Sequence, residues 1–273
     1  TVGAIVGVVF ATHIGMPLFG LKGLITFGAL VDLCISVGLL WLVAGPATQR
    51  DWRASAVAGI AIGAVILTLT SARLDPLKMA SGVYRYGTFI SHDEATSVFH
   101  EDGKTSSVDL VRYPSGGLVL FNNGKGEASI NMTPGAEPAV DEVTMVLTAV
   151  LPLAAQPEAR TAAVIGMGSG QTSHVLLGSG SLEQVDTIEI EAAVIDAARQ
   201  FGPKVKRVFE DERSRIFIDD AKSFLSTHNA SYDLIIAEPS NPWVSGVATL
   251  FSQEFYELAA THLRHGGVLA QWL

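Results

Sequence analysis

The stretch Thr161–Gly170, with the sequence TAAVIGMGSG, constrains the fold of this chain more than any other part of it. Its β-branched residues Val164 and Ile165 run directly into glycines, which predicts a buried strand ending in a tight turn with uncovered backbone N–H groups. A second apolar run ends at Glu189. It follows at about the twenty-residue distance at which a βαβ unit offers a carboxylate to ribose hydroxyls. Together, the two features predict a nucleotide-binding corner.

The spacing of the glycines indicates the kind of nucleotide. Gly166, Gly168 and Gly170 form the pattern G-x-G-x-G, whereas the dinucleotide fingerprint needs a third small residue where this chain has Gln171. G-x-G-x-G is typical of enzymes that bind S-adenosylmethionine or a relative, in which no pyrophosphate sits on the helix N-terminus. The alternative is that the glycines only make a strand-to-helix turn.

The first part of the chain is far more apolar than the rest, and raises the mean hydropathy of the whole sequence to +0.36. Three stretches, 2–18, 24–44 and 54–72, each approach the roughly 20 residues with which a helix crosses a bilayer. They predict three transmembrane helices within a domain of residues 1–73. The alternative is a buried helical core.

Charge and cysteine content exclude several classes of protein. The net charge is −9 and the acidic excess lies in the later part of the chain, which argues against a nucleic-acid partner. Cys34 is the one cysteine, so an intramolecular disulfide and Cys-rich zinc sites are excluded. The chain starts at Thr1 without methionine and stops at Leu273 inside a predicted strand, so we expect a fragment of a longer protein.

Residues 80–135 are expected to form a small antiparallel β-domain. From Val83 to Ile130 the apolar period is two, and turn residues interrupt it at 101–104, 114–117 and 122–125. This pattern predicts hairpins with one packed face. The residues expected on that face are Tyr84, Tyr86, Phe99, Val108, Leu110, Leu118 and Leu120.

Residues 136–273 alternate between strand and helix patterns after a helix that opens with Asp141 and Glu142. Such alternation predicts an α/β domain, a doubly wound and mostly parallel Rossmann-like sheet with helices on both faces. The predicted strands are 161–166, 185–190, 214–219, 232–238 and 267–272. The predicted helices are 171–178, 191–201, 220–227 and 252–263.

Polar residues follow several of these strands, and parallel strands of this kind bind ligands beyond their carboxyl ends. We expect the carboxylates there to face one crevice with the glycines, although each taken alone fits a solvated strand end. They are Glu189, Glu191, Asp219, Asp220 and Glu238.

Glu238 opens a loop with two prolines, EPSNPWVSG, which predicts a stiffly held carboxylate able to accept an amine proton. Trp243 in this loop is placed to shield the site from water. The alternative is that the prolines only shape a turn. His262 and His265 are expected in the last turn of the final helix, where they satisfy terminal carbonyls and do not bind metal.

Taken together, these motifs resemble the spermidine synthase family over residues 83–273. The resemblance is carried by the glycine stretch, Ile188–Glu191, Asp211–Leu225, Tyr232–Pro242 and Leu250–Tyr256. It implies transfer of an aminopropyl group from decarboxylated S-adenosylmethionine to a polyamine amine. The apolar part resembles the spans of bacterial membrane proteins that carry a spermidine synthase-like tail.

The resemblance also implies roles for individual residues. Glu238 stands at the catalytic position, Glu189 would hold the ribose, and Asp220 with Ala221 would meet the adenine. The glycine loop with Ser169 would contact the rest of the cofactor. The residues expected to bind the acceptor amine are Asp141, Asn241 and Trp243.

Four positions in three segments depart from the family pattern. Ser169 stands where the family usually has an aspartate that meets the cofactor's amine, and Met145 stands where it has a tyrosine. Glu238 and Asn241 replace two aspartates in the loop after the fourth strand. Because these changes remove negative charge or polarity from the amine path, a methyltransferase using S-adenosylmethionine stays open as an alternative. So does a non-catalytic nucleoside-sensing domain of a membrane transporter.

The expected partners are the membrane bilayer and a small-molecule amine acceptor, with a homodimer left open. Because adenosyl donors are made in the cytoplasm, we expect the C-terminal domain on the cytoplasmic side of the inner or plasma membrane.

Overall fold

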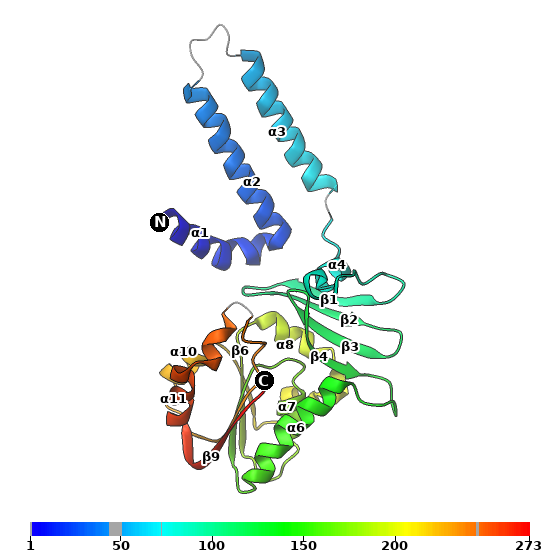
Figure 1. Cartoon of the computed structure of the whole chain (residues 1–273), viewed down its shortest axis with the longest axis vertical. Coiled ribbons are helices and arrows are strands. Elements are labelled where there is room, and N and C mark those ends of the chain that lie inside the picture. Colours follow the sequence, from blue (N-terminus) through cyan, green and yellow to red (C-terminus); the bar gives the residue numbers. More distant parts are fainter. Residues whose placement is uncertain (1, 44–50, 72, 244–245) are drawn as a thin grey trace. The chain divides into compact units, whose positions relative to one another are not determined.

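The computed structural model describes residues 2–43, 51–71, 73–243 and 246–273. The chain separates into two compact units, with the boundary between Asp75 and Pro76 (Figure 1).

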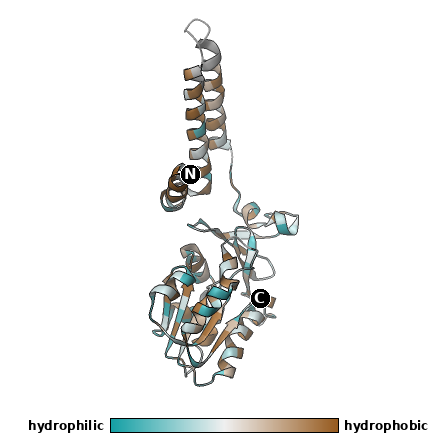
Figure 2. Cartoon of the chain, turned by 60° about the vertical axis from the view of Figure 1, so that its left-hand side comes forward, coloured by the Kyte–Doolittle hydropathy of each residue, from teal (hydrophilic) through white to brown (hydrophobic). Residues whose placement is uncertain are grey.

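The N-terminal unit consists of apolar helices, which Figure 2 shows mostly in hydrophobic colours. Its elements are α1 (Val2–Phe10), a π-helical turn (Ala11–Gly15), α2 (Met16–Val43) and α3 (Asp51–Ser71). Residues 19–23, between the first two stretches predicted to span the membrane, are helical except at Gly20, whose φ of 63° and ψ of −178° break the helix. Residues 2–39 are long and apolar enough to cross a membrane, and 55–71 form a shorter apolar helix. In the described residues, one stretch therefore meets the criteria for a span where the sequence predicted three; the predicted ends at 44 and 72 lie outside those residues.

The second unit begins with two short helices and an antiparallel sheet. The elements are α4 (Pro76–Ala80), α5 (Val83–Tyr86), β1 (Thr96–Asp102), β2 (Ser107–Arg112), β3 (Gly117–Asn122) and β4 (Lys125–Asn131), with the strands in the order β1-β2-β3-β4. Asn123 and Gly124 have φ of 49° and 76°, the left-handed pair that a two-residue hairpin requires. Tyr84 and Tyr86 are exposed on α5 and not on the sheet, so their predicted place in the hairpin pattern is wrong.

A parallel sheet follows, and it confirms the predicted α/β class. Its strands are β5 (Thr161–Ile165), β6 (Gln184–Glu189), β7 (Ser214–Ile218), β8 (Tyr232–Ala237) and β9 (Leu263–Gln271), in the order β7-β6-β5-β8-β9. The sheet order reverses between β5 and β8, because β6 and β7 lie on one side of β5 and β8 and β9 on the other. A ligand site is expected at this switch point.

Helices cover both faces of the parallel sheet (Figure 1). The α-helices of this part are α6 (Val140–Ala155), α7 (Gln171–Leu176), α8 (Ala192–Arg199), α9 (Lys206–Glu210), α10 (Ala221–Thr227) and α11 (Gln253–Thr261), with 3-10 turns at Gly202–Lys204 and Val247–Phe251. Ala162 and Val164 of β5 pack in one cluster with α6 and α7. Ala163 and Ile165 pack in another cluster with α10 and α11. All four are buried because both faces of the strand are covered.

The last helix ends earlier than the sequence predicted. Helix α11 stops at Thr261, and Leu263 already pairs with Tyr232 of β8, before a bulge in the register. His262 therefore follows the helix, with Nδ1 2.7 Å from the carbonyl oxygen of Ala230, and His265 lies in β9. Pairing with β8 overrides the helical pattern, so the prediction that both histidines lie in the last helical turn is wrong.

The antiparallel sheet packs directly over the glycine corner. Val108, Leu110, Leu118 and Leu120 are fully buried, as the sequence predicted, in one cluster with helix α8 and Met167 of the glycine loop. The small sheet thus belongs to the surroundings of the loop that follows β5.

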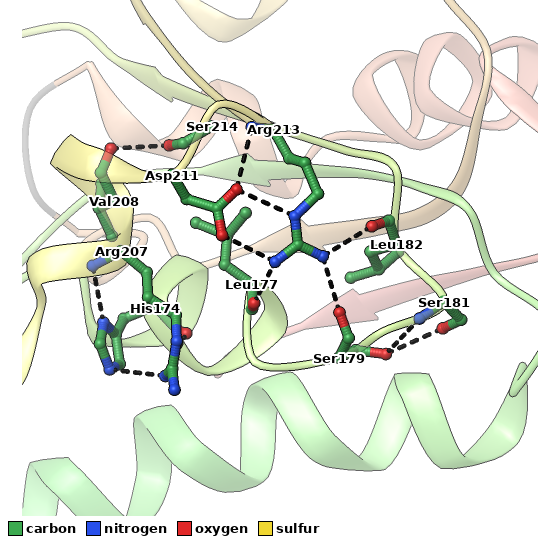
Figure 3. Close-up of polar contacts among 10 residues, drawn as sticks. All are labelled: His174, Leu177, Ser179, Ser181, Leu182, Arg207, Val208, Asp211, Arg213 and Ser214. Atoms are coloured by element: carbon green, nitrogen blue, oxygen red, sulfur yellow. Dashed lines mark hydrogen bonds and ion pairs between the residues drawn. The ribbon is translucent and has the colours of Figure 1, made fainter.

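Arg213 joins two segments near the start of β7 (Figure 3). Its guanidinium donates to the carbonyl oxygens of Leu177 at 2.6 Å, Ser179 at 2.8 Å and Leu182 at 2.9 Å. It also binds both carboxylate oxygens of Asp211, at 2.9 and 2.7 Å. These bonds lower the pKa of Asp211 to about 2. The turn before β7 is thereby tied to the segment that leads into β6.

We predict that Arg213→Ala lowers the free energy of unfolding by about 2–4 kcal/mol, because it leaves three carbonyls and a carboxylate without their donor. Arg160→Ala is the matched control. Among the described residues its exposed guanidinium pairs with the exposed Glu183, so we expect a loss below about 1 kcal/mol. Urea unfolding followed by circular dichroism measures both values. Equal losses would show that the Arg213 contacts are no stronger than a surface ion pair.

Candidate active site

The glycine loop leaves β5 in a conformation that glycine alone adopts readily. Gly166, Gly168 and Gly170 have φ of 89°, 51° and 85°. Gly166 also needs the space, since a Cβ there would lie 2.7 Å from the backbone oxygen of Glu238. The amide of Gly166 donates to Ile188 at 2.9 Å, which extends the pairing of β5 with β6 into the corner.

Glu189, at the end of β6, binds this loop directly. One carboxylate oxygen accepts from the Met167 amide at 2.9 Å and the other from the Glu191 amide at 3.0 Å. Burial raises the pKa of Glu189, while these backbone amides act in the opposite direction. Two features predicted separately, a glycine turn and a carboxylate, therefore form one hydrogen-bonded corner.

Glu238 follows β8 on the other side of β5. Its amide donates to Ile165 at 2.8 Å, which places it beside Gly166. The hydroxyl Oγ1 of Thr172 lies 2.8 Å from Oε1 and 3.0 Å from Oε2 of its carboxylate. Burial raises the pKa of Glu238 to about 7, against the opposing hydrogen bond from Thr172. A carboxylate with this pKa can both accept and release a proton near neutral pH.

Asp220 and Ala221 lie at the start of α10, beyond β7. The amide of Asp219 donates to the carbonyl of Glu189 at 3.0 Å, which brings this turn next to the glycine corner. Asp220 caps α10 by accepting from the Ser223 amide at 2.9 Å, and Ala221 is buried. The capping bond gives Asp220 a structural role and leaves its second carboxylate oxygen for a ligand.

The three residues expected to bind the acceptor have different surroundings. Asp141, at the start of α6, accepts a hydrogen bond from Ser129 of β4 at 2.7 Å. Asn241 is half-buried in the loop after β8. Trp243 is 73% exposed, so in this structure it does not shield the site from water as the sequence suggested.

Two expected site residues point elsewhere. The Ser169 side chain is fully buried, with its hydroxyl 3.1 Å from the sulfur of Met145, and is unavailable to a ligand in this structure. Glu191 is buried against the turn between β1 and β2, where it accepts from the amide and hydroxyl of Thr105 at 2.6 and 2.7 Å. The expectation that Glu191 faces the crevice is therefore wrong, because it ties the small sheet to α8.

A buried ion pair near the site was not foreseen. The ammonium of Lys125 lies 2.8 Å from Glu127 and 2.9 Å from the hydroxyl of Ser240, which in turn donates to Glu127 at 2.7 Å. Ser240 lies two residues after Glu238, so this cluster holds the loop after β8 against β4. The sequence signal was the i, i+2 spacing of Lys125 and Glu127, but the register shift at Glu127, where Phe121 pairs with Gly126 and Leu120 with Ala128, interrupts the regular alternation of faces.

Comparison with known proteins agrees with this geometry. Residues 143–271 match the family model described as "Spermine/spermidine synthase domain". Spermidine synthase 1 of Datura stramonium is 36% identical over 170 residues, which are 61% of this chain and 52% of that protein. The polyamine aminopropyltransferase of Alkaliphilus oremlandii is 33% identical over 119 residues, 44% of this chain and 42% of that protein. The chain thus spans about half the length, or less, of these curated relatives.

Solved structures show the same fold. A spermidine synthase in complex with the transition-state analogue AdoDATO superposes with a TM-score of 0.58 at 22% identity, over 67% of this chain and 59% of that one. The spermidine synthase of Thermotoga maritima gives 0.56 at 22% identity, over 67% and 58%. The spermidine synthase-like fold and the resemblance seen in the sequence are both confirmed.

We predict that Gly166→Ala destabilises the protein by about 2–4 kcal/mol, because the added methyl group meets the Glu238 carbonyl and the residue keeps a left-handed φ. Gly168→Ala is the matched control. It shares the left-handed φ, but its Cβ would lie at an ordinary 3.6 Å from Ala128, so we expect about 1–2 kcal/mol. Thermal unfolding compares the two variants. A Gly168→Ala loss as large as that of Gly166→Ala would contradict the close approach of β5 and β8.

Proposed function

Because residues 143–271 form a domain of the spermine/spermidine synthase type, we propose that this protein is an aminopropyltransferase. The proposed donor is decarboxylated S-adenosylmethionine and the proposed acceptor is a polyamine amine. The observation that carries the proposal is the hydrogen-bonded corner of Met167 and Glu189 with Glu238 beside it. It combines a nucleoside-binding turn with a proton acceptor at one sheet edge.

In the proposed reaction the amine nitrogen forms a bond to the aminopropyl carbon. The carbon–sulfur bond of the sulfonium breaks, and its electron pair goes to sulfur, which leaves as neutral methylthioadenosine. The proton of the amine passes to the Glu238 carboxylate. A sulfonium is already a good leaving group, so the protein mainly aligns the nucleophile and removes its proton.

We assign binding of the donor to the β6 side of β5, opposite the side on which Glu238 lies. Gly166, Gly168 and Gly170 allow its close approach, and Glu189 retains lone pairs for the ribose hydroxyls beyond its two bonds to backbone amides. Asp220 and Ala221 would meet the adenine. Asp141, Asn241 and Trp243 remain the proposed acceptor contacts.

A methyltransferase that uses S-adenosylmethionine is the second candidate. The buried Ser169 hydroxyl and its contact with Met145 favour it, because the glycine loop then offers no carboxylate to the amine of a decarboxylated donor, whereas S-adenosylmethionine balances its amine with its own carboxylate. Incubation with each donor, followed by chromatography, distinguishes the two. Methylthioadenosine indicates aminopropyl transfer, S-adenosylhomocysteine indicates methyl transfer, and binding without either product indicates a sensor.

We predict that Glu238→Gln lowers kcat by about 10²- to 10⁴-fold, the usual contribution of a general base, while donor affinity measured by calorimetry stays the same. Glutamine keeps the shape and the hydrogen bond from Thr172 but cannot take a proton. Turnover equal to that of the unmodified protein would remove Glu238 from the mechanism.

The activity should depend on the ionisation of Glu238. Because the base must be ionised, kcat/KM is expected to rise with pH and to level off above a midpoint of about 7. The residual activity of Glu238→Gln should lack this inflection. An inflection that persists in the variant would assign it to the substrate amine instead.

We predict that Glu189→Ala weakens donor binding about 5- to 150-fold, equivalent to about 1–3 kcal/mol, because the ribose loses its acceptor and the loop loses the bond at Met167. Glu183→Ala, which removes an exposed carboxylate before β6, should leave the affinity unchanged. Calorimetry with the donor measures both. An unaltered affinity in Glu189→Ala would contradict the ribose role.

We also assign a membrane anchor to the apolar helices of residues 2–71, with the later residues on the cytoplasmic side of the inner or plasma membrane. The length and composition of Val2–Leu39 support this assignment. The protein should stay in the membrane pellet after alkaline carbonate extraction. In a Cys34→Ser background, Glu183→Cys should resist an impermeant maleimide in intact cells, and rapid labelling would reverse the orientation.

A further inference from the structure

The hydroxyl of Thr172 lies between the carboxylate of Glu238 and a backbone carbonyl. Its oxygen is 2.8 and 3.0 Å from the two carboxylate oxygens and 3.3 Å from the carbonyl oxygen of Met145. Thr172 is 2% exposed, so its hydroxyl is shielded from bulk water. The hydroxyl therefore connects α7, the loop after β8 and α6 through a single oxygen atom.

A hydroxyl carries one proton, so Thr172 cannot donate to both neighbours at once. When Glu238 is ionised, its carboxylate is the stronger acceptor and accepts the hydrogen bond that the Thr172 hydroxyl donates. When Glu238 is protonated, its own O–H can donate to the Thr172 oxygen, and Thr172 can then donate to the Met145 carbonyl. Both protonation states of Glu238 can bond to this hydroxyl, and the bond to the ionised carboxylate is the stronger one.

We propose that Thr172 is a positioning residue that orients the Glu238 carboxylate and stabilises its ionised form, so that it is ready to take the amine proton. The inference rests on the proposed function of Glu238 as the base. It adds a specific side chain through which the fold controls that base.

The charged groups on the elements around Glu238 are bonded to other partners. The contacts are Lys125 with Glu127 on β4, Asp141 with Ser129, Glu142 with the amides of Asn131 and Ala139 and with Lys204, Glu189 with the amides of Met167 and Glu191, and His174 of α7 with Arg207. Burial and the hydrogen bond from Thr172 are accordingly the two influences that act on the pKa of Glu238. The hydroxyl is the one that favours the charged form.

The test uses Thr172→Val, which removes the hydroxyl at nearly constant volume, and Thr172→Ser, which keeps it. The ionisation of Glu238 is followed by infrared spectroscopy, as the difference between each protein and its Glu238→Gln derivative, so no turnover is needed. We expect Thr172→Val to move the midpoint upward by about 1–2 pH units, since a hydrogen bond to the charged form is lost. Thr172→Ser should restore it, and the pH profile of kcat/KM should shift with the infrared midpoint.

Ser173→Ala is the matched control, because Ser173 is an equally buried hydroxyl on α7 that bonds to Thr187 of β6 at 2.7 Å and not to Glu238. It should leave the Glu238 midpoint in place. A Thr172→Val midpoint equal to that of the unmodified protein, or a shift of the same size in Ser173→Ala, would overturn the proposal. The infrared titration is independent of catalysis, so a shift without product formation would refute the proposed function and not the positioning role.

Discussion

The bond between the Glu189 carboxylate and the Met167 amide is the contact on which the candidate site depends. A buried carboxylate is costly unless hydrogen bonds satisfy it, and a loop of glycines at positive φ is poorly ordered unless something holds it. The amide of the loop gives the buried carboxylate a hydrogen bond, and the carboxylate in turn orders the loop. The same contact ties the ends of β5 and β6 together, beside the point between β5 and β8 where the sheet order reverses.

Much of the fold could be predicted from the sequence, because the apolar residues of buried strands and amphipathic helices follow patterns that are typical of each element. The β8 residues Leu234, Ile235 and Ile236 form an apolar run that only a strand covered on both faces explains, and all three are fully buried. Periodicity failed where tertiary pairing decides the outcome. Leu263 continues a helical pattern but belongs to β9, since it pairs with Tyr232.

Side-chain direction limited the prediction of the site. Glu189 and Glu191 share a strand end and a chemistry, yet one faces the glycine loop and the other the turn at Thr105. The spacing of two residues does not indicate that the side chains point in different directions, because Glu191 lies past the strand and caps α8. The role proposed for Thr172 was equally invisible. It arises from three elements meeting at one oxygen atom, and no local pattern in the sequence encodes such a meeting.

The buried pair of Lys125 and Glu127 has a consequence for engineering this protein. Ser240 bonds to both charges, so the loop that starts with Glu238 is fastened to the small sheet as well as to its own strand. Removing one partner of a buried pair leaves the other charge buried without a counter-ion, which lowers the stability far more than removing a surface contact does. A chimera in which the small sheet comes from a relative must therefore also take the loop after β8 from that relative.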